Sequence, residues 1–476
     1  MNDRATLLSQ LETCLGAGAV LQSKTDIDGF VEDFKGRYRG EALCVVQPNS
    51  TGKVAAVVRL CAGHGVSIIP QGGNTSLCGG SVPSEQQGMP VVLSLSRMRA
   101  IRSIDVANGT MVVEAGCILK TVQDAAAQVK RLYPVSLGAE GSCQIGGTLS
   151  TNAGGTNVLR YGNTRENVLG LEVVLPDGSV WDGLRGLRKD NTGIDLKQIF
   201  IGAEGTLGII TAATLKLHPL PSHHSLAWLA PASLNAAMRV MNIFQEEAST
   251  KLSAFELMNR RQLELIIERV HDRKDPLQGD FDWRVLVELS DVRDQAGLYA
   301  LLQQLLEQAA EEGLILDAVV ATNDTQRAEI WGLRHSVTEA NKKAGIGLNT
   351  DCAVPVSAVP QFVEEATAAV CQHYPEMDVV IVGHMGDGNI HFIPMLSFER
   401  WSALADKAGI SIGVRRLVND IAHKLGGTFS AEHGIGQTGM SEMAHYKSET
   451  ELRLMRAIKA AIDPNRVMNP GRLVPD

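Results

Sequence analysis

Two glycine-rich stretches in the first 160 residues constrain the fold more than any other feature of the sequence. Residues 70–80 read PQGGNTSLCGG and directly follow an apolar strand pattern, and residues 138–155 read GAEGSCQIGGTLSTNAGG. Glycine permits positive φ and a close approach of the backbone to a ligand. Adjacent backbone N–H groups beside Asn74, Thr75 and Ser76 can cradle a pyrophosphate. Irregular surface loops are the alternative, but a core-forming domain rarely needs so much glycine.

Length and charge exclude several classes of protein. A chain of 476 residues suggests two or three domains. The net charge of -9 does not favour binding to nucleic acid or to an anionic membrane surface. The eight cysteines form no C-x-x-C pair and are expected to be reduced, and no window reaches the ~18 apolar residues of a membrane span. Without a signal-peptide pattern, we expect a cytoplasmic protein, with peripheral attachment at the inner membrane as a variant.

The hydrophobic pattern predicts a first domain over residues 1–221. It contains a β-α-β segment, a helix near residues 119–132 and a hairpin around the turn Pro176-Asp177-Gly178. The predicted strands are residues 42–46, 66–70, 91–95, 111–115, 173–175, 179–181 and 206–217. Prolines in residues 218–222 interrupt the pattern and suit a linker.

Alternating strand and helix patterns follow the linker. Strands are predicted at residues 226–229, 252–257, 285–289 and 314–319, and the last helix at residues 451–462. Long polar–apolar helices separate these strands, which favours a largely antiparallel sheet. We therefore predict an α+β protein with a second domain over residues 222–430 and a C-terminal segment over residues 431–476.

The segment GHMGDGNIHF predicts a metal site. Two strand patterns flank Asp387-Gly388, a strong two-residue hairpin signal. With that turn, His384 lies directly opposite His391, and opposed residues have Cβ atoms ~4.5–5.5 Å apart. A slip of one residue would move one histidine to the other face of the sheet. This register therefore predicts that both imidazoles bind one ion.

The third ligand is predicted to be Glu432, in the segment TFSAEHG. Two histidines and one carboxylate leave an open coordination position, as a catalytic ion needs. The adjacent His433 is a candidate base. Zinc is the first choice for a divalent ion with these ligands, and manganese or iron are alternatives. Ordinary strand histidines beside an exposed acid are the structural alternative.

A G-x-G-x-x-G match at residues 434–439 does not predict a nicotinamide site. Such a site needs a preceding strand, a helix, and a second strand with an acid ~20 residues on. Here the chain continues into one helix and then ends.

Taken together, these segments resemble the FAD-linked oxidases of the vanillyl-alcohol oxidase superfamily, in the branch of D-lactate, D-2-hydroxyglutarate and glycolate dehydrogenases. The resemblance extends from about Ala42 to Leu473 and rests on PQGGNTSL, GSCQIGGTLSTNAGGTNVLRYG, FIGAEGTLGIIT, GHMGDGNIHF, AEHGIGQTGM and DPNRVMNPGR. It implies a two-part FAD-binding domain of that superfamily's type, and an antiparallel-sheet substrate domain with flanking helices. It also implies that the C-terminal tail returns to the FAD domain.

The resemblance assigns the flavin contacts to the glycine loops and the tail. Covalent members carry histidine where this chain has Asn74, which implies non-covalent FAD. The implied contacts are Pro70, Gly72, Gly73, Asn74, Thr75, Ser76, Leu77, Gly138, Gly141, Ser142, Gly146, Gly147, Thr148, Thr151, Asn152, Ala153, Gly154, Glu204, Gly205, Gly208, Ile209 and Asn469.

The same resemblance matches His384, His391 and Glu432 to the metal ligands and His433 to the catalytic base. It matches Arg334 to the arginine that binds the substrate carboxylate, and Thr338 is predicted to lie one helical turn further on, facing the same pocket. Asn349 stands where 2-hydroxyglutarate enzymes usually carry lysine, and Ile393 where they tend to carry asparagine. Because both changes weaken recognition of a second carboxylate, the sequence favours a D-lactate-like substrate over D-2-hydroxyglutarate.

The expected reaction is oxidation of a D-2-hydroxy acid to the 2-oxo acid, with hydride passing to flavin and His433 taking the hydroxyl proton. Arg334 is expected to hold the substrate carboxylate through a bidentate pair. Because the chain has no iron–sulfur cysteine pattern, electrons are expected to pass to a quinone, a cytochrome or an electron-transfer flavoprotein. The sequence leaves the oligomeric state open, a homodimer included. A zinc hydrolase with a histidine base would leave the two glycine loops unexplained. A non-catalytic protein that uses the metal as a structural staple is the other alternative.

Overall fold

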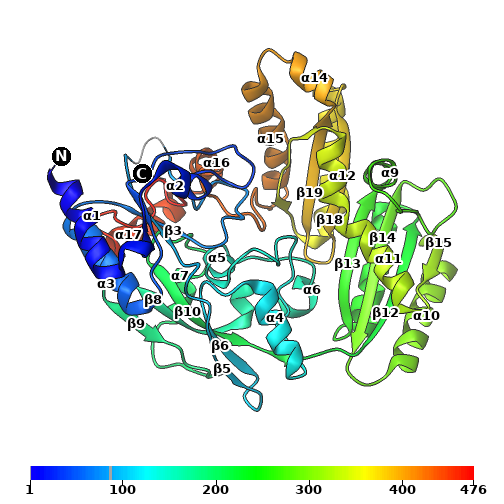
Figure 1. Cartoon of the computed structure of the whole chain (residues 1–476). Helices are drawn as coiled ribbons and strands as arrows, with labels where there is room; N and C mark the ends of the chain where they lie inside the picture. The colour runs from blue at the N-terminus through cyan, green and yellow to red at the C-terminus, as the bar shows by residue number, and fades with distance from the viewer. Residues whose placement is uncertain (1, 85–87, 476) are drawn as a thin grey trace. The chain divides into compact units, whose positions relative to one another are not determined.

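The computed structural model describes residues 2–84 and 88–475, which form two compact units. Unit 1 comprises Met1–Gly155, Tyr161–Leu220 and Glu432–Asp476. Unit 2 comprises Thr156–Arg160 and Pro221–Ala431 (Figure 1). The chain therefore leaves unit 1 after Leu220 and returns to it at Glu432.

The first sheet of unit 1 contains the predicted β-α-β segment. Its elements are α1 (Asn2–Leu15), β1 (Val20–Leu21), α2 (Lys24–Val31), β2 (Cys44–Val46), α3 (Thr51–Gly63), β3 (Ile68–Gln71) and β4 (Val91–Ser94). Strands β2 and β3 pair in parallel with β4 between them, and β1 adds an antiparallel edge. Apolar residues of α1 and α3 pack on one face, and Val31 of α2 packs on the other. Burial on both faces explains the continuous apolar runs of β2 and β4.

The second sheet of unit 1 is antiparallel and has the order β5-β6-β10-β8-β9. Its elements and the helices packed on it are β5 (Ile101–Asp105), β6 (Thr110–Glu114), α4 (Leu119–Gln128), α5 (Ile145–Ser150), β8 (Val168–Val174), β9 (Val180–Gly183) and β10 (Ile209–Lys216). The pairing of β8 with β9 confirms the predicted hairpin. Gly178 supplies the positive φ of 77° that its turn requires, and Asp177 accepts the Ser179 N–H at 2.8 Å.

Two predictions in unit 1 were wrong at their ends. The predicted helix of residues 119–132 ends at Gln128, because Lys130 adopts a positive φ of 55°. The following residues form the short strand β7 (Arg131–Leu132), which pairs with β11 (His218–Pro219). The linker predicted at residues 218–222 therefore begins with a strand. Pro219 is tolerated there because β11 is an edge strand of a two-stranded sheet, so its missing N–H group is not needed for pairing with a further strand.

The shorter elements and the C-terminal helices complete unit 1. They are η1 (Ala17–Ala19), η3 (Thr164–Asn167), α7 (Lys197–Phe200), α16 (Met440–Tyr446) and α17 (Glu449–Ile462). The short helix α6 (Val158–Tyr161) belongs mostly to unit 2, which includes Thr156–Arg160, and its last residue belongs to unit 1. The predicted last helix begins at Glu449 because Ser448 and Glu451 form a capping box. After α17, Met468 bridges to Ile68, so the tail adds to the edge of β3.

One large antiparallel sheet forms the centre of unit 2. Its strands are β12 (His223–Pro231), β13 (Leu252–Asn259), β14 (Trp283–Asp291), β15 (Ile315–Val320), β16 (Ile346–Gly347), β17 (Cys352–Ala353), β18 (Asp378–His384) and β19 (Asn389–Leu396). The order is β15-β12-β14-β13-β18-β19-β16, with β17 also paired to β19. The four strands predicted before residue 320 are confirmed, as is the α+β class with an antiparallel sheet.

Helices cover both faces of this sheet. One apolar core holds α8 (Leu234–Ala248), α10 (Gln295–Glu311), α13 (Val359–His373) and α15 (Lys407–Lys424) against one face. A second core holds α9 (Arg260–Arg269), α11 (Asp324–His335) and α12 (Val337–Ala344) against the other face, which we call the α11 face. The remaining helices are η4 (Val356–Ala358) and α14 (Phe398–Ala403). Among the described residues, no helix combines the length and the apolar character needed to cross a bilayer.

The predicted register of the β18–β19 hairpin was wrong by two residues. His384 pairs with Asn389, and His391 pairs with Val382, so the loop has four residues rather than two. The N–H groups of Asp387 and Gly388 both donate to the carbonyl oxygen of His384, at 3.2 and 3.1 Å. Gly388 has a φ of 81°. Because the shift is even, His384 and His391 still share one face, as diagonal rather than opposed neighbours.

Candidate flavin and metal sites

The segments predicted to bind FAD lie together in unit 1. A Cβ on Gly73 would lie 2.2 Å from the carbonyl oxygen of Ser142, so the first and second glycine-rich segments are in contact. The Glu204 N–H donates to the Ser150 carbonyl oxygen at 2.8 Å, which joins the second segment to the third. These segments are residues 70–77 at the end of β3, residues 138–154 around α5, and residues 204–209 at the start of β10.

The C-terminal tail joins the same cluster. Asn469 is 1% exposed, and its side-chain amide donates to the carbonyl oxygens of Glu204 at 2.8 Å and Gly80 at 3.0 Å. Lys459 of α17 fixes the tail further, because its ammonium donates to the carbonyl oxygens of Thr206 and Met468. The fold therefore brings together all four groups of residues to which the resemblance assigned FAD.

Backbone strain concentrates in these segments. Asn74, Asn152, Glu204 and Asn469 have positive φ values of 52°, 48°, 50° and 40°. Residues other than glycine adopt this region at a cost of about 1–3 kcal/mol each, and such strain gathers at ligand sites. The four segments thus carry the kind of strain that is typical of a preorganised binding site.

The polar groups and open space in this cluster fit FAD. The amide oxygens of Gln144 and Asn469 are buried and have no hydrogen-bond partner in the part of the chain that the structure describes. Cβ atoms on Gly138, Gly141 or Gly147 would meet no described atom within 4 Å. FAD offers hydroxyl and N–H donors to such amide oxygens, and a pyrophosphate to backbone N–H groups.

Glu204 has a role that the sequence did not reveal. Its carboxylate accepts the backbone N–H of Ile435 at 2.6 Å and of Gly436 at 2.8 Å. Burial raises the pKa of this carboxyl group, while these two N–H groups and Arg472 oppose the rise. The side chain of Glu204 therefore anchors the loop that follows His433, and its assignment to FAD remains a prediction.

The two histidines predicted to bind a metal lie on the α11 face of the sheet in unit 2. His384 is 6% exposed, and the His384 and His391 rings lie edge to face with centroids 5.6 Å apart. The Nδ1 atom of His384 lies 2.8 Å from the Glu256 carboxylate. The Nε2 atom of His384 lies 3.3 Å from Nη2 of Arg334 on α11. The arginine predicted to bind substrate and a nitrogen predicted to bind the metal are therefore neighbours.

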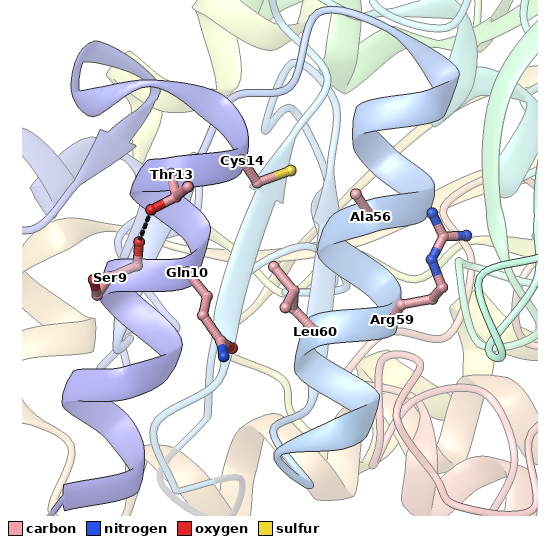
Figure 2. A pocket seen from close by; sticks show the side chains of 7 residues that line it. All are labelled: Ser9, Gln10, Thr13, Cys14, Ala56, Arg59 and Leu60. Carbon is pink, nitrogen blue, oxygen red and sulfur yellow. Dashed lines mark hydrogen bonds between the residues drawn. The ribbon is translucent and has the colours of Figure 1, made fainter.

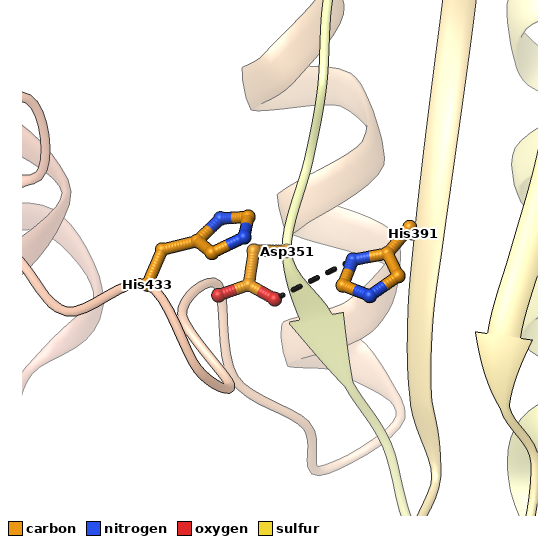
Figure 3. Close-up of side chains that lie close together, drawn as sticks. All are labelled: Asp351, His391 and His433. Carbon is orange, nitrogen blue, oxygen red and sulfur yellow. Dashed lines mark ion pairs between the residues drawn. The ribbon is translucent and has the colours of Figure 1, made fainter. Parts of the chain in front are cut away.

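Two groups of side chains could hold a metal ion. His384, His391 and Glu432 form the predicted group, and Asp351, His391 and His433 form a second one (Figure 3). In each group, one ligand atom per residue lies within 4.8 Å of the others. Ser430 and Ala431 bind the backbone of Asp351, and Glu432 and His433 are the next residues of the chain.

Asp351 and Asn389 lie beside the predicted metal-binding residues and were not predicted from the sequence. The Asp351 carboxylate lies 3.8 Å from Nδ1 of His391 and accepts the Asn389 side-chain amide at 3.2 Å. The amide oxygen of Asn389 is buried without a hydrogen-bond partner among the described residues. Both residues flank predicted site residues, Asn349 and His391, and this proximity was the available signal.

The residues predicted to bind substrate differ in their exposure to solvent. The side chain of Arg334 is 14% exposed, whereas Thr338 and Asn349 are exposed. The predicted continuous helix from Arg334 to Thr338 was wrong, because Ser336 ends α11 and precedes α12. The Ser336 hydroxyl donates to the Gly332 carbonyl oxygen at 2.6 Å and accepts from Arg273, while the Ser336 backbone N–H also donates to the Gly332 carbonyl oxygen at 3.1 Å.

A separate open groove lies between α1 and α3 (Figure 2). Its volume is about 430 Å³. It is lined by Ser9, Gln10, Thr13, Cys14, Ala56, Arg59 and Leu60, which include none of the predicted FAD or metal residues.

Comparison with known proteins identifies the family. Residues 42–183 match the family described as FAD binding domain, and residues 220–473 match FAD linked oxidases, C-terminal domain. The chain is 36% identical over 450 residues to the D-2-hydroxyglutarate dehydrogenase of Xanthomonas citri pv. viticola, covering 94% of this chain and 92% of the relative. It is 33% identical over 476 residues to the D-2-hydroxyglutarate dehydrogenase of Stutzerimonas stutzeri, covering 99% of each.

The chain is also 33% identical over 461 residues to a mitochondrial protein of Schizosaccharomyces pombe that is named as a D-lactate dehydrogenase by inference. The match covers 94% of this chain and 85% of that protein. Among solved structures, p-cresol methylhydroxylase with bound substrate superposes with a TM-score of 0.78 at 16% identity, covering 99% and 97% of the two chains. The chain therefore belongs to the FAD-linked oxidase family, with the fold of the vanillyl-alcohol oxidase superfamily. Within this family it is an FAD-dependent D-2-hydroxy acid dehydrogenase.

Proposed function

We propose that this dehydrogenase oxidises D-2-hydroxyglutarate to 2-oxoglutarate. The observation that carries this choice is the similarity, over nearly the whole chain, to relatives named D-2-hydroxyglutarate dehydrogenase in two bacteria. The proposal reverses the preference for a D-lactate-like substrate that the sequence analysis drew from Asn349 and Ile393.

Arg334 binds the 2-carboxylate in this proposal. Its Nε donates to Glu256 at 2.7 Å, which leaves the Nη2 side of the guanidinium directed towards Nε2 of His384. A carboxylate held there accepts charge-assisted hydrogen bonds from the arginine. The hydroxyl carbon of the same substrate is then held beside His384 and His391.

His433 takes the hydroxyl proton as the hydrogen on C2 leaves as hydride. One nitrogen of His433 belongs to the group formed with Asp351 and His391, so a proton acceptor is available beside the metal ligands. A divalent ion bound by His384, His391 and Glu432 would lower the pKa of the substrate hydroxyl. Bound FAD would accept the hydride. We further propose zinc as the ion and a separate protein or quinone as the final electron acceptor.

D-lactate is the second candidate substrate, favoured by the surroundings of Asn349. A Cβ on Gly347 would lie 2.8 Å from Cγ2 of Ile393 and 2.9 Å from Oδ1 of Asn349, so these two side chains are neighbours. Neither carries a charge to bind a second carboxylate. A short monocarboxylate would need none.

Anaerobic titration of the flavin absorbance separates the candidates. We expect D-2-hydroxyglutarate to bleach the flavin of the purified holoenzyme at lower concentration than D-lactate, D-malate or a larger apolar D-2-hydroxy acid. The L enantiomer of each acid is the control and should leave the flavin oxidised. Bleaching by D-lactate alone would establish the second candidate. A protein that never takes up FAD would sink the assignment altogether.

Asn349→Lys tests whether this position lies near the distal end of the substrate. Because Asn349 is exposed, the substitution disturbs little packing. An exposed ion pair contributes about 0.2–1 kcal/mol, so we expect the KM for D-2-hydroxyglutarate to fall about two- to fivefold. The KM for D-lactate should stay unchanged, and Asn349→Gln is the neutral control. An equal change for both substrates would place residue 349 away from the distal carboxylate.

A further inference from the structure

Glu256 is the most deeply buried carboxylate that contacts the predicted active-site residues. It lies on β13, opposite His384 of β18, and is 3% exposed. One oxygen is 2.8 Å from Nδ1 of His384, and the other accepts from Nε of Arg334 at 2.7 Å. A single side chain thus contacts a metal ligand and the arginine that binds the substrate.

A carboxylate at this depth needs both partners. Burial opposes ionisation of Glu256, and each of its two oxygens has one partner, Nδ1 of His384 at 2.8 Å and Nε of Arg334 at 2.7 Å. An isolated buried carboxylate would instead be protonated or would destabilise the fold. The three side chains therefore depend on one another.

The geometry also determines how His384 faces the metal site. Because a carboxylate is an acceptor only, the Nδ1 atom of His384 must carry the proton in this hydrogen bond. The other nitrogen, Nε2, which lies 3.3 Å from Nη2 of Arg334, then carries the lone pair and is the atom that can bind an ion. Carboxylates that accept from metal-binding histidines in this way fix the ring orientation and raise the basicity of the ligand.

We propose that Glu256 is a positioning residue that sets the tautomer of His384 and the orientation of Arg334, and so couples metal binding to recognition of the substrate carboxylate. The coupling to substrate rests on the proposed function. The effect on metal affinity does not, because it follows from the contact between Glu256 and His384 alone.

Glu256→Gln is the informative variant, and Glu288→Gln is its matched control. Glu288 lies on the same face of the neighbouring strand β14, is 5% exposed, and binds Arg327 and Trp331 rather than His384 or Arg334. Glutamine keeps the size of Glu256 but can accept at one end only, so its amide N–H group must face one of the two donors. Glu256→Asp, which keeps the charge, serves as the second variant.

The experiment measures zinc per holoenzyme after dialysis against a series of chelator concentrations, together with flavin content, kcat and KM. We expect Glu256→Gln to weaken zinc binding about 10–100-fold with FAD retained. KM should rise more than kcat falls, because Arg334 is misaligned. Glu256→Asp should recover part of both properties, and Glu288→Gln should match the wild type.

Unchanged zinc affinity in Glu256→Gln, with only a lower melting temperature, would overturn the proposal, as would equal losses in Glu288→Gln. If Glu256→Gln does not fold, the same zinc titration on Glu256→Asp decides, and wild-type affinity there counts against the proposal. Failure of the wild type to oxidise any D-2-hydroxy acid would refute the proposed function instead, and the zinc titration would still decide the role of Glu256.

Discussion

Replacing His433 by alanine is expected to lower kcat about 10²- to 10⁴-fold while the protein keeps its FAD and its metal ion. The reason is that general-base catalysis by a positioned side chain contributes a factor of this size. Rapid mixing of the variant with substrate, followed through the flavin absorbance, measures the loss in the reductive step itself. Free imidazole in the buffer should restore part of the rate, because it can enter the space that the ring has left.

The structure makes this prediction sharper, because it offers His433 a second role. His391 belongs both to the group with His384 and Glu432 and to the group with Asp351 and His433. If the first group holds the ion, Glu432→Ala should lose the metal and His433→Ala should keep it. Loss of metal in His433→Ala, with retention in Glu432→Ala, would assign His433 as a ligand and refute its role as the base. His423→Ala, an exposed histidine in the last turn of α15, is the control and should match the wild type in rate and metal content.

The β18–β19 hairpin shows which structural features could be predicted from the sequence and which could not. Alternation of side chains in β18 and β19 placed His384 and His391 on one face, and that conclusion survived a wrong register because the error was even. The loop length did not follow from Asp387-Gly388. It depends on Gly388 fitting against Val354, whose carbonyl oxygen would lie 2.1 Å from any added Cβ. Such a contact arises from a segment that is distant in sequence, so no local pattern reports it.

Glu256 was missed for a similar reason. The strand of residues 252–257 was predicted from its apolar character, yet an acid within a buried strand has to be paired. Its partners, Arg334 and His384, are 78 and 128 residues away. The sequence could therefore signal that Glu256 is unusual but not what it binds.

Ser336 marks a break between two helices that the sequence pattern did not indicate. Residues 324–344 contain no proline, and the glycine at 332 lies inside a helix that continues beyond it, so the pattern predicted one helix across Arg334 and Thr338. At the break, the buried Ser336 hydroxyl accepts from Arg273 at 2.9 Å, a contact with a part of unit 2 that is distant in sequence. Arg334 therefore occupies the last turn of α11, and its direction is set by Glu256 rather than by the helix that carries Thr338.

Arg334→Ala is expected to lower kcat/KM for the D-2-hydroxy acid about 10²- to 10³-fold. Truncating one partner of a buried charge-assisted pair with a ligand costs roughly 2–5 kcal/mol of binding, and the Arg334 side chain that would pair with the substrate carboxylate is 14% exposed. Arg334→Lys should recover little, because an ammonium cannot reproduce the guanidinium fork that reaches Glu256, His384 and a carboxylate together. Steady-state kinetics with the holoenzyme, with flavin and metal content measured on the same samples, provide the test.

A substrate analogue makes the Arg334 prediction specific to carboxylate recognition. The carboxamide of the D-2-hydroxy acid lacks the charge that Arg334 would bind, so the wild type and Arg334→Ala should process it at nearly the same low kcat/KM. Arg327→Ala is the matched control, since Arg327 lies on the same helix and pairs with Glu288. It should leave kcat/KM for the acid close to that of the wild type. Substrate binding by Arg334 depends on the charge of the carboxylate, whereas an effect through the position of His384 does not. If Arg334→Ala slowed the acid and the carboxamide equally, the arginine would therefore act through His384 and not by binding the substrate.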